Sequence, residues 1–565
     1  MSVVLANTYL ITTPINGVDD LSQKLILSGL QFEILDPLEL GEEWSQIHTL
    51  ENKVEVNTKE LEIVDRVLTA YQPKGLLESF VDHRALGSAN EVLQARDNKS
   101  DLKTIVHKLD QYLDLENDEN GEGNPTKSAL EYIKSTLSKY NINPEGLQPK
   151  DYKLISAYHA SLELDIKLSQ VREKIFSTKA NSNTYFAFFS VDKLVAKAFE
   201  KLLLKEKVNF EKVDWNKEIV VWRNKGGLSA FQGVAQSLGT IDTKEVDPTV
   251  SISVFFTLFF AFCLGDAIYG LILAIFCGYF LYFKKLKKNY QNIFRLFFYS
   301  GLVTVLIGAL QNSWAGDLLI NSPARPFVEV FQIVDLLNPD SPAILNVFLK
   351  ENGGISPIVF MLGLSAFIGL INIFCGYILH MVTSLKSSDF GKFKMELNWL
   401  LFILAILGTI ASLSFAEALL TPFAAVVVIT GLGLFVLNEG KNIVGKILGG
   451  LGNLYNLIGF FADILSYTRL IAVGLTSGIV ASVINLLAKL VFESIDIPVL
   501  NLVLALLVLF GGHVFNLVVA LFGAYINPLR LHYVEFMPKF FEGRGRALKA
   551  VDSDFSRLNL NYHSK

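Results

Sequence analysis

The ionisable residues with the clearest chemical meaning lie inside long apolar stretches in the second half of this 565-residue chain. Asp463, Ser466 and Arg469 belong to the run FADILSYTRLIAVGL, and Arg530 and Glu535 belong to the run PLRLHYVEF. Placing an arginine at the centre of a membrane helix costs about 2.5–3.5 kcal/mol, so such a residue usually faces a polar interior and serves a function. The two runs therefore indicate a charged site within a membrane.

Simpler roles compete with this interpretation. Arg469 lies in the middle of its predicted helix and could pair with Asp463 or with backbone carbonyl groups. Arg530 opens a basic segment and could simply extend its long side chain to the membrane interface. Asp266, between two apolar runs, suits a helix cap as well as a functional role. His513 is more often a hydrogen-bonded core residue than a proton carrier.

Other kinds of site are not indicated. The chain contains no GxxxxGK[ST], HExxH or CxxC pattern, so no ATP site, cofactor or metal centre is predicted. Cys263, Cys277 and Cys375 all lie in apolar stretches and are interpreted as small core residues.

The elements that must position the charged residues follow from composition. Residues 1–247 contain 29 Lys and Arg against 38 Asp and Glu, whereas residues 248–565 contain 21 and 17. The first part has the charge density of a soluble domain, and the second is far more apolar. An acidic soluble part without basic clusters argues against nucleic-acid binding.

A membrane-spanning helix needs about 20 apolar residues. From Pro248 onward eight segments qualify, at 250–264, 268–283, 294–312, 355–380, 397–414, 422–438, 454–490 and 499–530. The first two could instead be one long helix, which would give seven spans.

The distribution of basic residues favours eight spans, because cytoplasmic loops carry the excess of Lys and Arg. Eight spans place 14 basic residues on one side, within 284–295, 386–394, 441–446 and 539–549, and only Arg325, Lys350 and Lys489 on the other. The predicted fold class is an α-helical membrane protein with eight transmembrane helices, the last two long and tilted. Both termini are expected in the cytoplasm.

The predicted domains are residues 1–247, a cytoplasmic α/β domain, and residues 248–565, the membrane domain. No signal-peptide pattern opens the chain. Strand-like runs at 3–11 and 183–191 flank helical patterns that fill 44–178. This order predicts two small α/β lobes joined by a long antiparallel helical hairpin.

Four motifs then suggest a family: DPT at 247–249, LGDAIYG at 264–270, SYTRL at 466–470 and PLRLHYVEF at 528–536. With them the chain resembles the membrane-embedded stator subunit of rotary V/A-type ATPases, called subunit a, or subunit I in bacteria and archaea. The short soluble half resembles the bacterial or archaeal type. The resemblance implies a multi-pass protein of a bacterial or archaeal plasma membrane.

In that family a ring of small subunits, each with one intramembrane carboxylate, rotates past the stator between two offset half-channels. The resemblance implies that Arg469 and Arg530 supply the fixed positive charge between the half-channels. It also implies weaker candidates that line or orient the path, namely Asp463, Glu535, Asn527 and Ser466. Asn527 and Asp463 each stand where the eukaryotic pattern has a His, so the lining of the half-channels differs here.

The implied subunit is non-catalytic, and its soluble domain would bind the peripheral stalks that reach the ATPase head complex. The alternative function is a secondary transporter or channel with a cytoplasmic regulatory domain. Such transporters often contain an internal repeat, and residues 250–380 and 397–530 show none that is convincing.

Overall fold

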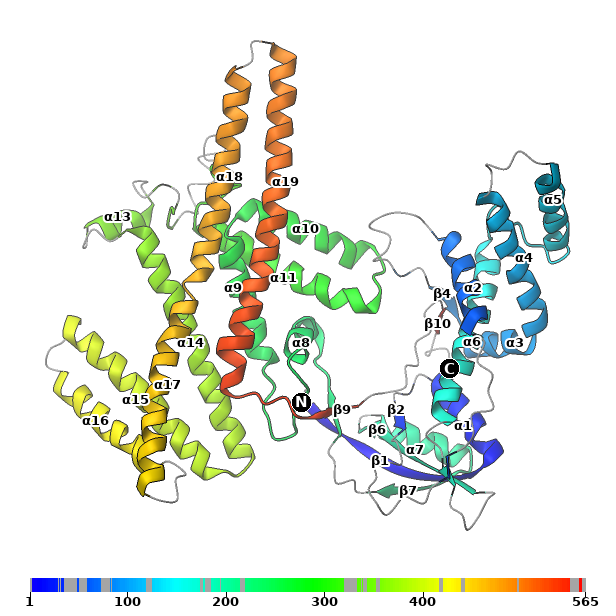
Figure 1. Ribbon diagram of the computed structural model, residues 1–565, viewed down its shortest axis with the longest axis horizontal. Helices are drawn as coiled ribbons and strands as arrows, with labels where there is room; N and C mark the ends of the chain where they lie inside the picture. Colours follow the sequence, from blue (N-terminus) through cyan, green and yellow to red (C-terminus); the bar gives the residue numbers. More distant parts are fainter. Residues whose placement is uncertain are drawn as a thin grey trace. The chain divides into compact units, whose positions relative to one another are not determined.

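The computed structural model of the chain describes residues 3–28, 30, 32–34, 48–49, 58–72, 82, 84–117, 124–172, 176–177, 184–193, 195–213, 219–319, 333–336, 338, 343–351, 356–415, 420–437, 443–494, 497–548 and 558–560 (Figure 1). Of the basic residues used above for orientation, Arg325, Lys441 and Lys549 lie outside these ranges. The chain forms two units, Val3–Trp222 with Arg546–Lys565, and Arg223–Gly545.

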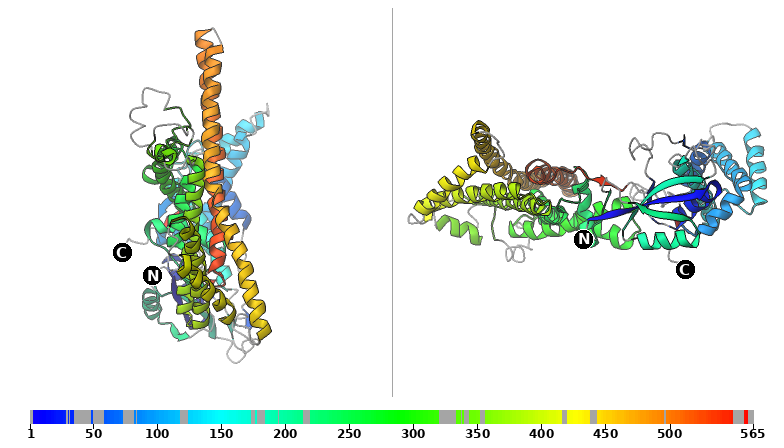
Figure 2. Two further views of the ribbon diagram at one scale, coloured as in Figure 1. Left: turned by 90° about the vertical axis from the view of Figure 1, so that its left-hand side faces the viewer. Right: turned by 90° about the horizontal axis from the view of Figure 1, so that it is seen from below.

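The first unit is built around one mixed sheet with the strand order β3-β5-β6-β1-β8-β9, in which β2 also pairs with β6 and β7 with β1. The strands are β1(Val3–Pro14), β2(Phe32–Ile34), β3(His48–Thr49), β5(Phe176–Ser177), β6(Thr184–Asp192), β7(Asn209–Val213), β8(Ile219–Trp222) and β9(Arg546–Ala547). Figure 2 shows β1 as the longest of these strands. A separate pair joins β4(Ala85–Gly87) to β10(Leu558–Leu560).

The strands predicted near 3–11 and 183–191 do not belong to separate lobes. β1 and β6 pair directly and antiparallel, with Tyr9 opposite Phe189. Both side chains are buried in the same core, because alternate residues of paired strands point to one face. The two predicted lobes thus share one sheet.

The helices of the first unit pack beside this sheet and against one another. They are α1(Ile15–Leu27), α2(Thr58–Ala70), α3(Ala89–Asp97), α4(Lys99–Asn117), α5(Asn124–Ser138), α6(Pro149–Arg172) and α7(Ala196–Lys205). Val64, Val106 and Leu164 are fully buried among them. Their apolar residues recur at the three- to four-residue spacing of an amphipathic helix, which is why this face is buried.

The second unit is almost entirely helical. Its helices are α8(Ser229–Gln236), α9(Thr249–Leu264), α10(Ala267–Phe283), α11(Lys288–Leu310), α13(Ile344–Glu351), α14(Pro357–Lys386), α15(Phe390–Phe415), α16(Leu420–Val436), α17(Ile443–Ser466), α18(Arg469–Ser494) and α19(Pro498–Arg530). Among the described residues, five helical segments are long and apolar enough to cross a membrane, and α9, α10 and α16 are shorter apolar helices. The chain is therefore a multi-pass membrane protein, and the count of eight spans stays a prediction.

α9 and α10 are two helices and not one. Gly265 adopts a left-handed conformation with φ of 62°, which ends α9. Asp266 then caps α10 by accepting hydrogen bonds from the backbone N–H groups of Ile268 and Tyr269. Asp266 thus has the helix-cap role that competed with a functional one.

The boundary between the two units differs from the predicted one. The first unit ends at Trp222 and not at Asp247, and the chain returns to this unit at Arg546. β9 adds to β8 in parallel, and Leu558 of β10 is fully buried in the first unit's core. Charge density did not reveal this return, because a few strand residues do not change the average of a long segment.

Candidate functional site

Arg469 lies at a break between two helices. α17 ends at Ser466 and α18 begins at Arg469, so a two-residue turn precedes Arg469 near the middle of the apolar segment Gly445–Ser494. At the break the backbone N–H groups of Tyr467 and Thr468 donate to the carbonyl groups three residues earlier, 3.1 Å away in both cases. This tighter pattern interrupts the α-helix, and Figure 1 shows α17 leading directly into α18.

The break is anchored by Tyr467, whose side chain is fully buried. Its hydroxyl accepts a hydrogen bond of 3.0 Å from Asn372 Nδ2 on α14. A Cβ atom built on Gly369 would lie 2.2 Å from the Tyr467 ring, so only glycine lets α14 approach this closely. These contacts hold the break between α17 and α18 against α14.

The guanidinium group of Arg469 has a nitrogen whose hydrogen-bonding capacity is unfilled. Its Nη1 atom is buried and has no hydrogen-bond partner among the described residues. A buried charged donor normally has a partner, because an unsatisfied one is costly. Arg469 therefore has spare capacity to bind an anion.

Arg530 is the last residue of α19. Pro528 lies inside the last turn of α19 and has no N–H to donate. The chain continues as the π-helical turn η7(Leu531–Phe536) and the 3-10 turn η8(Met537–Lys539). His532 Nδ1 donates to the Pro528 carbonyl at 2.8 Å, which stabilises this irregular segment. The side chain of Arg530 is exposed.

Glu535 lies in η7 and brings the two arginines into one electrostatic environment. Its side chain is 2% exposed, and its Oε2 atom has no hydrogen-bond partner among the described residues. Charges that act on it are those of Asp463, Arg530 and Arg469, and the Ser466 hydroxyl is within hydrogen-bonding reach. That hydroxyl donates to the Ala462 carbonyl at 3.1 Å and can turn to the carboxylate instead.

Asp463 and Lys539 form an ion pair of 2.6 Å that joins α17 to η8. Their side chains are 22% and 23% exposed, so the pair is partly accessible to solvent. It lies on the wall of a cavity of about 560 Å³. The cavity is lined by residues of α14, α15, α16, α17 and η8, including Glu396, Asn453 and Asn456. A polar cavity thus reaches the carboxylate of Asp463.

Of the six residues predicted from sequence, Asp463, Arg469, Arg530 and Ser466 act on the Glu535 carboxyl group, and their joint role as a site stays a prediction. Asn527 differs, because its Nδ2 atom donates to the Gly523 carbonyl of its own helix at 2.9 Å. Sequence reasoning did not pair Lys539 with Asp463, and it missed the approach of His380 Nδ1 to within 3.1 Å of Glu396 Oε1. Glu396 lines the cavity. Lys539 follows the motif that ends at Phe536 by three residues, so a comparison of charges on the last two spans could have found the pair.

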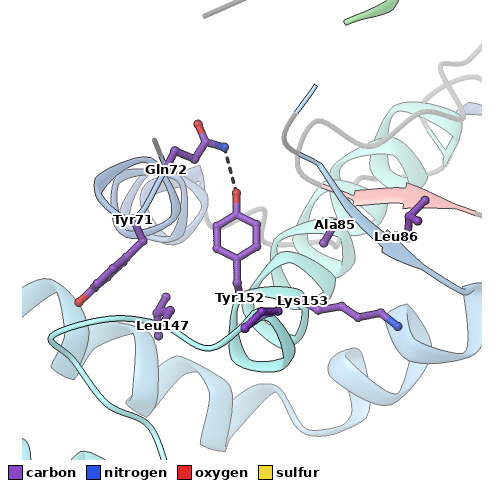
Figure 3. Close-up of a pocket in the computed structure, with 8 residues that line it drawn as sticks. Tyr71, Gln72, Ala85, Leu86, Leu147, Tyr152 and Lys153 are labelled. Carbon is purple, nitrogen blue, oxygen red and sulfur yellow. Dashed lines mark hydrogen bonds between the residues drawn. The ribbon is translucent and has the colours of Figure 1, made fainter. Parts of the chain in front are cut away.

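A second cavity, of about 390 Å³, belongs to the first unit (Figure 3). Gln72 Nε2 donates to the Tyr152 hydroxyl there at 2.9 Å. Lys153 is the charged residue of its lining, and it pairs with Glu91 at 2.8 Å. This cavity offers no spare charge among its described lining residues, so the charged site remains that of the second unit.

Comparison with known proteins confirms the resemblance predicted from the motifs. The chain is 31% identical to the A-type ATP synthase subunit I of Pyrococcus horikoshii over 344 residues, which are 60% of this chain and 48% of the relative. It is 30% identical to that of Methanocaldococcus jannaschii over 348 residues, 58% of this chain and 48% of the relative. It is 26% identical to the V-type ATP synthase subunit I of Borreliella burgdorferi over 304 residues, which are 52% of this chain and 47% of the relative.

The chain spans about half the length of these curated relatives. No protein-family model matches it.

Proposed function

We propose that this chain is the membrane stator subunit of a V/A-type rotary ATPase or ATP synthase. The proposal is supported by relatives named subunit I and above all by one observation. Arg469 carries a buried guanidinium nitrogen with no partner among the described residues, at a helix break held by Tyr467. Such a group suits an anion that arrives from another subunit.

The anion would be a carboxylate on a ring of small membrane subunits. An arginine stays protonated at any physiological pH and lowers the cost of burying an ionised carboxylate within the membrane. It also repels a cation that would otherwise pass directly between the two half-channels. Arg469 and Arg530 share this role, and the exposure of Arg530 leaves it available to the ring.

The polar cavity beside Asp463 would be the access path on the side of the lysine-bearing helix ends. Lys539, Glu396 and the asparagines of α17 give it a polar lining. Asp463 of this cavity and the two arginines all act on the Glu535 carboxyl group. An ion entering the cavity would meet carboxylates first and the fixed positive charge last.

The first unit would hold the subunit still by binding peripheral stalks that reach the ATPase head. Rotation of the ring does work only against a stationary partner, so the stator needs this second attachment. We place the protein in a bacterial or archaeal plasma membrane with eight spans and both termini in the cytoplasm. None of the relatives named above is a secondary transporter or channel.

Affinity purification of the tagged chain in mild detergent tests the assignment. A stator subunit is expected to bring along a very small hydrophobic protein with one intramembrane carboxylate, together with ATPase head subunits. Purification of the chain alone, with ion transport activity of its own in liposomes, would support the transporter alternative and contradict the proposal.

A further inference from the structure

An open groove lies within the second unit, between α8, α9, α11 and the 3-10 turn η4(Gly226–Leu228) that precedes α8. Its volume is about 570 Å³, within the range of about 300–1,000 Å³ that is usual for ligand sites. Its wall includes Phe231 of α8, Val254, Thr257 and Leu258 of α9, and Tyr299 and Val303 of α11. The groove is accessible from outside the unit, because the Val254 side chain is 60% exposed.

The wall of the groove is apolar, although two of its residues carry hydroxyl groups. The Ser253 hydroxyl donates to the Val250 carbonyl, and the Thr257 hydroxyl donates to the Ser253 carbonyl, each at 2.7 Å. Both donors are therefore used by their own helix. The α11 side of the groove belongs to a segment that is long and apolar enough to cross a membrane. A wall of this kind suits a hydrocarbon chain and not an ion.

One end of the groove is basic. Arg295, Tyr299 and Val303 follow one another at a spacing of four residues on α11, so they share one face of the helix. Arg295 lies about 6 Å nearer to the start of α11 than Tyr299 does. Lys225 is exposed and directly precedes η4. This turn approaches α11 closely, because a Cβ atom built on Gly227 would lie 3.3 Å from the Tyr299 hydroxyl oxygen.

The positive charges at this end are not balanced by acidic neighbours. No residue in the described part of the chain forms an ion pair with Lys225 or Arg295. Asp247, before α9, accepts hydrogen bonds from the N–H and the hydroxyl of Thr249. Basic pockets between membrane helices are a common binding site for anionic lipid head groups. The sequence from Ala267 to Leu310 contains no acidic residue and five basic ones, Lys284, Lys285, Lys287, Lys288 and Arg295.

We propose that this groove binds an anionic phospholipid. One hydrocarbon chain would lie along α9 and α11, and the phosphate would lie at Lys225 and Arg295. The Tyr299 hydroxyl, which makes no hydrogen bond to another described residue, would donate to the lipid. A phospholipid supplies both the apolar chain and the negative charge that the groove lacks. The proposal goes beyond the proposed function, because neither the ring nor the half-channels enter it.

Native mass spectrometry of the purified full-length protein tests the proposal. The protein in mild detergent receives equal amounts of phosphatidylglycerol, which is anionic, and phosphatidylcholine, which is zwitterionic, with identical hydrocarbon chains. We expect one phosphatidylglycerol per chain to be retained at least about tenfold more often than phosphatidylcholine, because each basic group near the anionic head group strengthens binding. Equal retention of the two lipids would overturn the proposal.

Two variants test the two ends of the groove separately. The double variant Lys225→Gln with Arg295→Gln should bind phosphatidylglycerol about tenfold more weakly and lose the preference over phosphatidylcholine. Val254→Trp adds a large ring at an exposed position of the wall and should weaken binding of both lipids. The matched control is Lys446→Gln, because Lys446 is an exposed lysine of α17, which does not line the groove. A preference that survives in the double variant would place the lipid elsewhere and contradict the proposal.

Two further measurements identify the occupant. Glycerophosphoglycerol, the head group without hydrocarbon chains, should not displace the bound lipid, and displacement at equal concentration would show a site for free phosphate esters instead. A photoreactive amino acid in place of Val254 in the assembled complex should crosslink to phospholipid. A crosslink to a protein subunit would assign the groove to a protein partner and overturn the proposal. None of these measurements requires transport or ATP hydrolysis, so their outcome is independent of the proposed function.

Discussion

Arg469 and Arg530 occupy different surroundings, although Arg469 is the first residue of α18 and Arg530 the last residue of α19. Arg469 has a buried nitrogen beside the break between α17 and α18, whereas the side chain of Arg530 is exposed. An exposed arginine near a helix end could be only an interfacial anchor. The two roles of Arg530 therefore differ in whether another positively charged side chain can replace its guanidinium group.

Arg530→Lys separates the two roles. An anchor tolerates lysine, because both long side chains reach water equally well. A partner of the ring carboxylate needs the planar guanidinium fork, so we expect ATP-driven pumping to fall about tenfold or more, which is about 1.4 kcal/mol. Arg544→Lys is the matched control, because the Arg544 side chain is 83% exposed. Full pumping by Arg530→Lys and by Arg530→Ala would reduce Arg530 to an anchor.

The pair of Asp463 and Lys539 gives a second test at this scale. The pair is partly buried at 2.6 Å, so a double-mutant cycle of Asp463→Asn and Lys539→Gln should give a coupling energy of about 1 kcal/mol, the upper end for accessible ion pairs. Thermal inactivation of the assembled complex measures it. The control cycle uses Lys489 and Glu493, whose Nζ and Oε1 atoms lie 3.9 Å apart. Their side chains are 71% and 59% exposed. Equal coupling in the two pairs would remove any special role for the first.

Residue types and spacing were sufficient to single out Asp463, Arg469 and Arg530, whose charges act on Glu535. An arginine in an apolar run stands out from its neighbours in any sequence. Lys539 did not stand out, because a lysine near a predicted span end is ordinary and its partner Asp463 lies 76 residues earlier. Side-chain pairs between helices that are far apart in the sequence depend on how the helices pack, and packing cannot be predicted from a single sequence.

At the scale of elements, both arginines lie where regular helix gives way to another geometry. The α17–α18 break and the π-helical turn η7 each release backbone groups from the usual pattern. The apolar composition predicted membrane-spanning helices, and five described segments are long and apolar enough to be such helices, but composition did not predict the break. Tyr467 and Thr468 carry no glycine or proline signal, and the break depends on the contact between Tyr467 and Gly369 of α14.

The C-terminal strands are the least expected elements. Leu558 of β10 is fully buried in the core of the first unit, although it follows the last membrane helix in sequence. We expect Leu558→Ala to lower the free energy of unfolding of this unit by about 2–5 kcal/mol, the usual loss for a buried leucine. Limited proteolysis and thermal unfolding of the whole protein measure the change.

The control for this experiment is Leu204→Ala, because the Leu204 side chain is 68% exposed in the same unit. That substitution should change stability by no more than about 0.5 kcal/mol. Similar effects of Leu558→Ala and Leu204→Ala would mean that the C-terminal strand does not stabilise the first unit.

At the scale of the whole molecule, the chain passes from the first unit to the second at Trp222–Arg223 and returns at Gly545–Arg546. A fragment of residues 1–247, the predicted soluble domain, therefore lacks β9 and β10. We expect stalk subunits to bind the first unit only when residues 546–560 are supplied with it, because the sheet and the core are otherwise incomplete. Pull-down with purified stalk subunits, with circular dichroism to confirm folding, is the measurement. A folded fragment with both strands that fails to bind would contradict the stator assignment of this unit.

The most direct test of the central claim is ATP-driven ion uptake by liposomes that contain the assembled complex with Arg469→Ala or Arg469→Lys. The substitution removes the guanidinium group that we assign to the ring carboxylate, and it leaves the anchoring contacts of Tyr467 in place. Co-purification of all subunits establishes that the complex is intact. The account predicts an intact complex in which both substitutions abolish uptake. Uptake at the unmodified rate by the Arg469→Ala complex would contradict it.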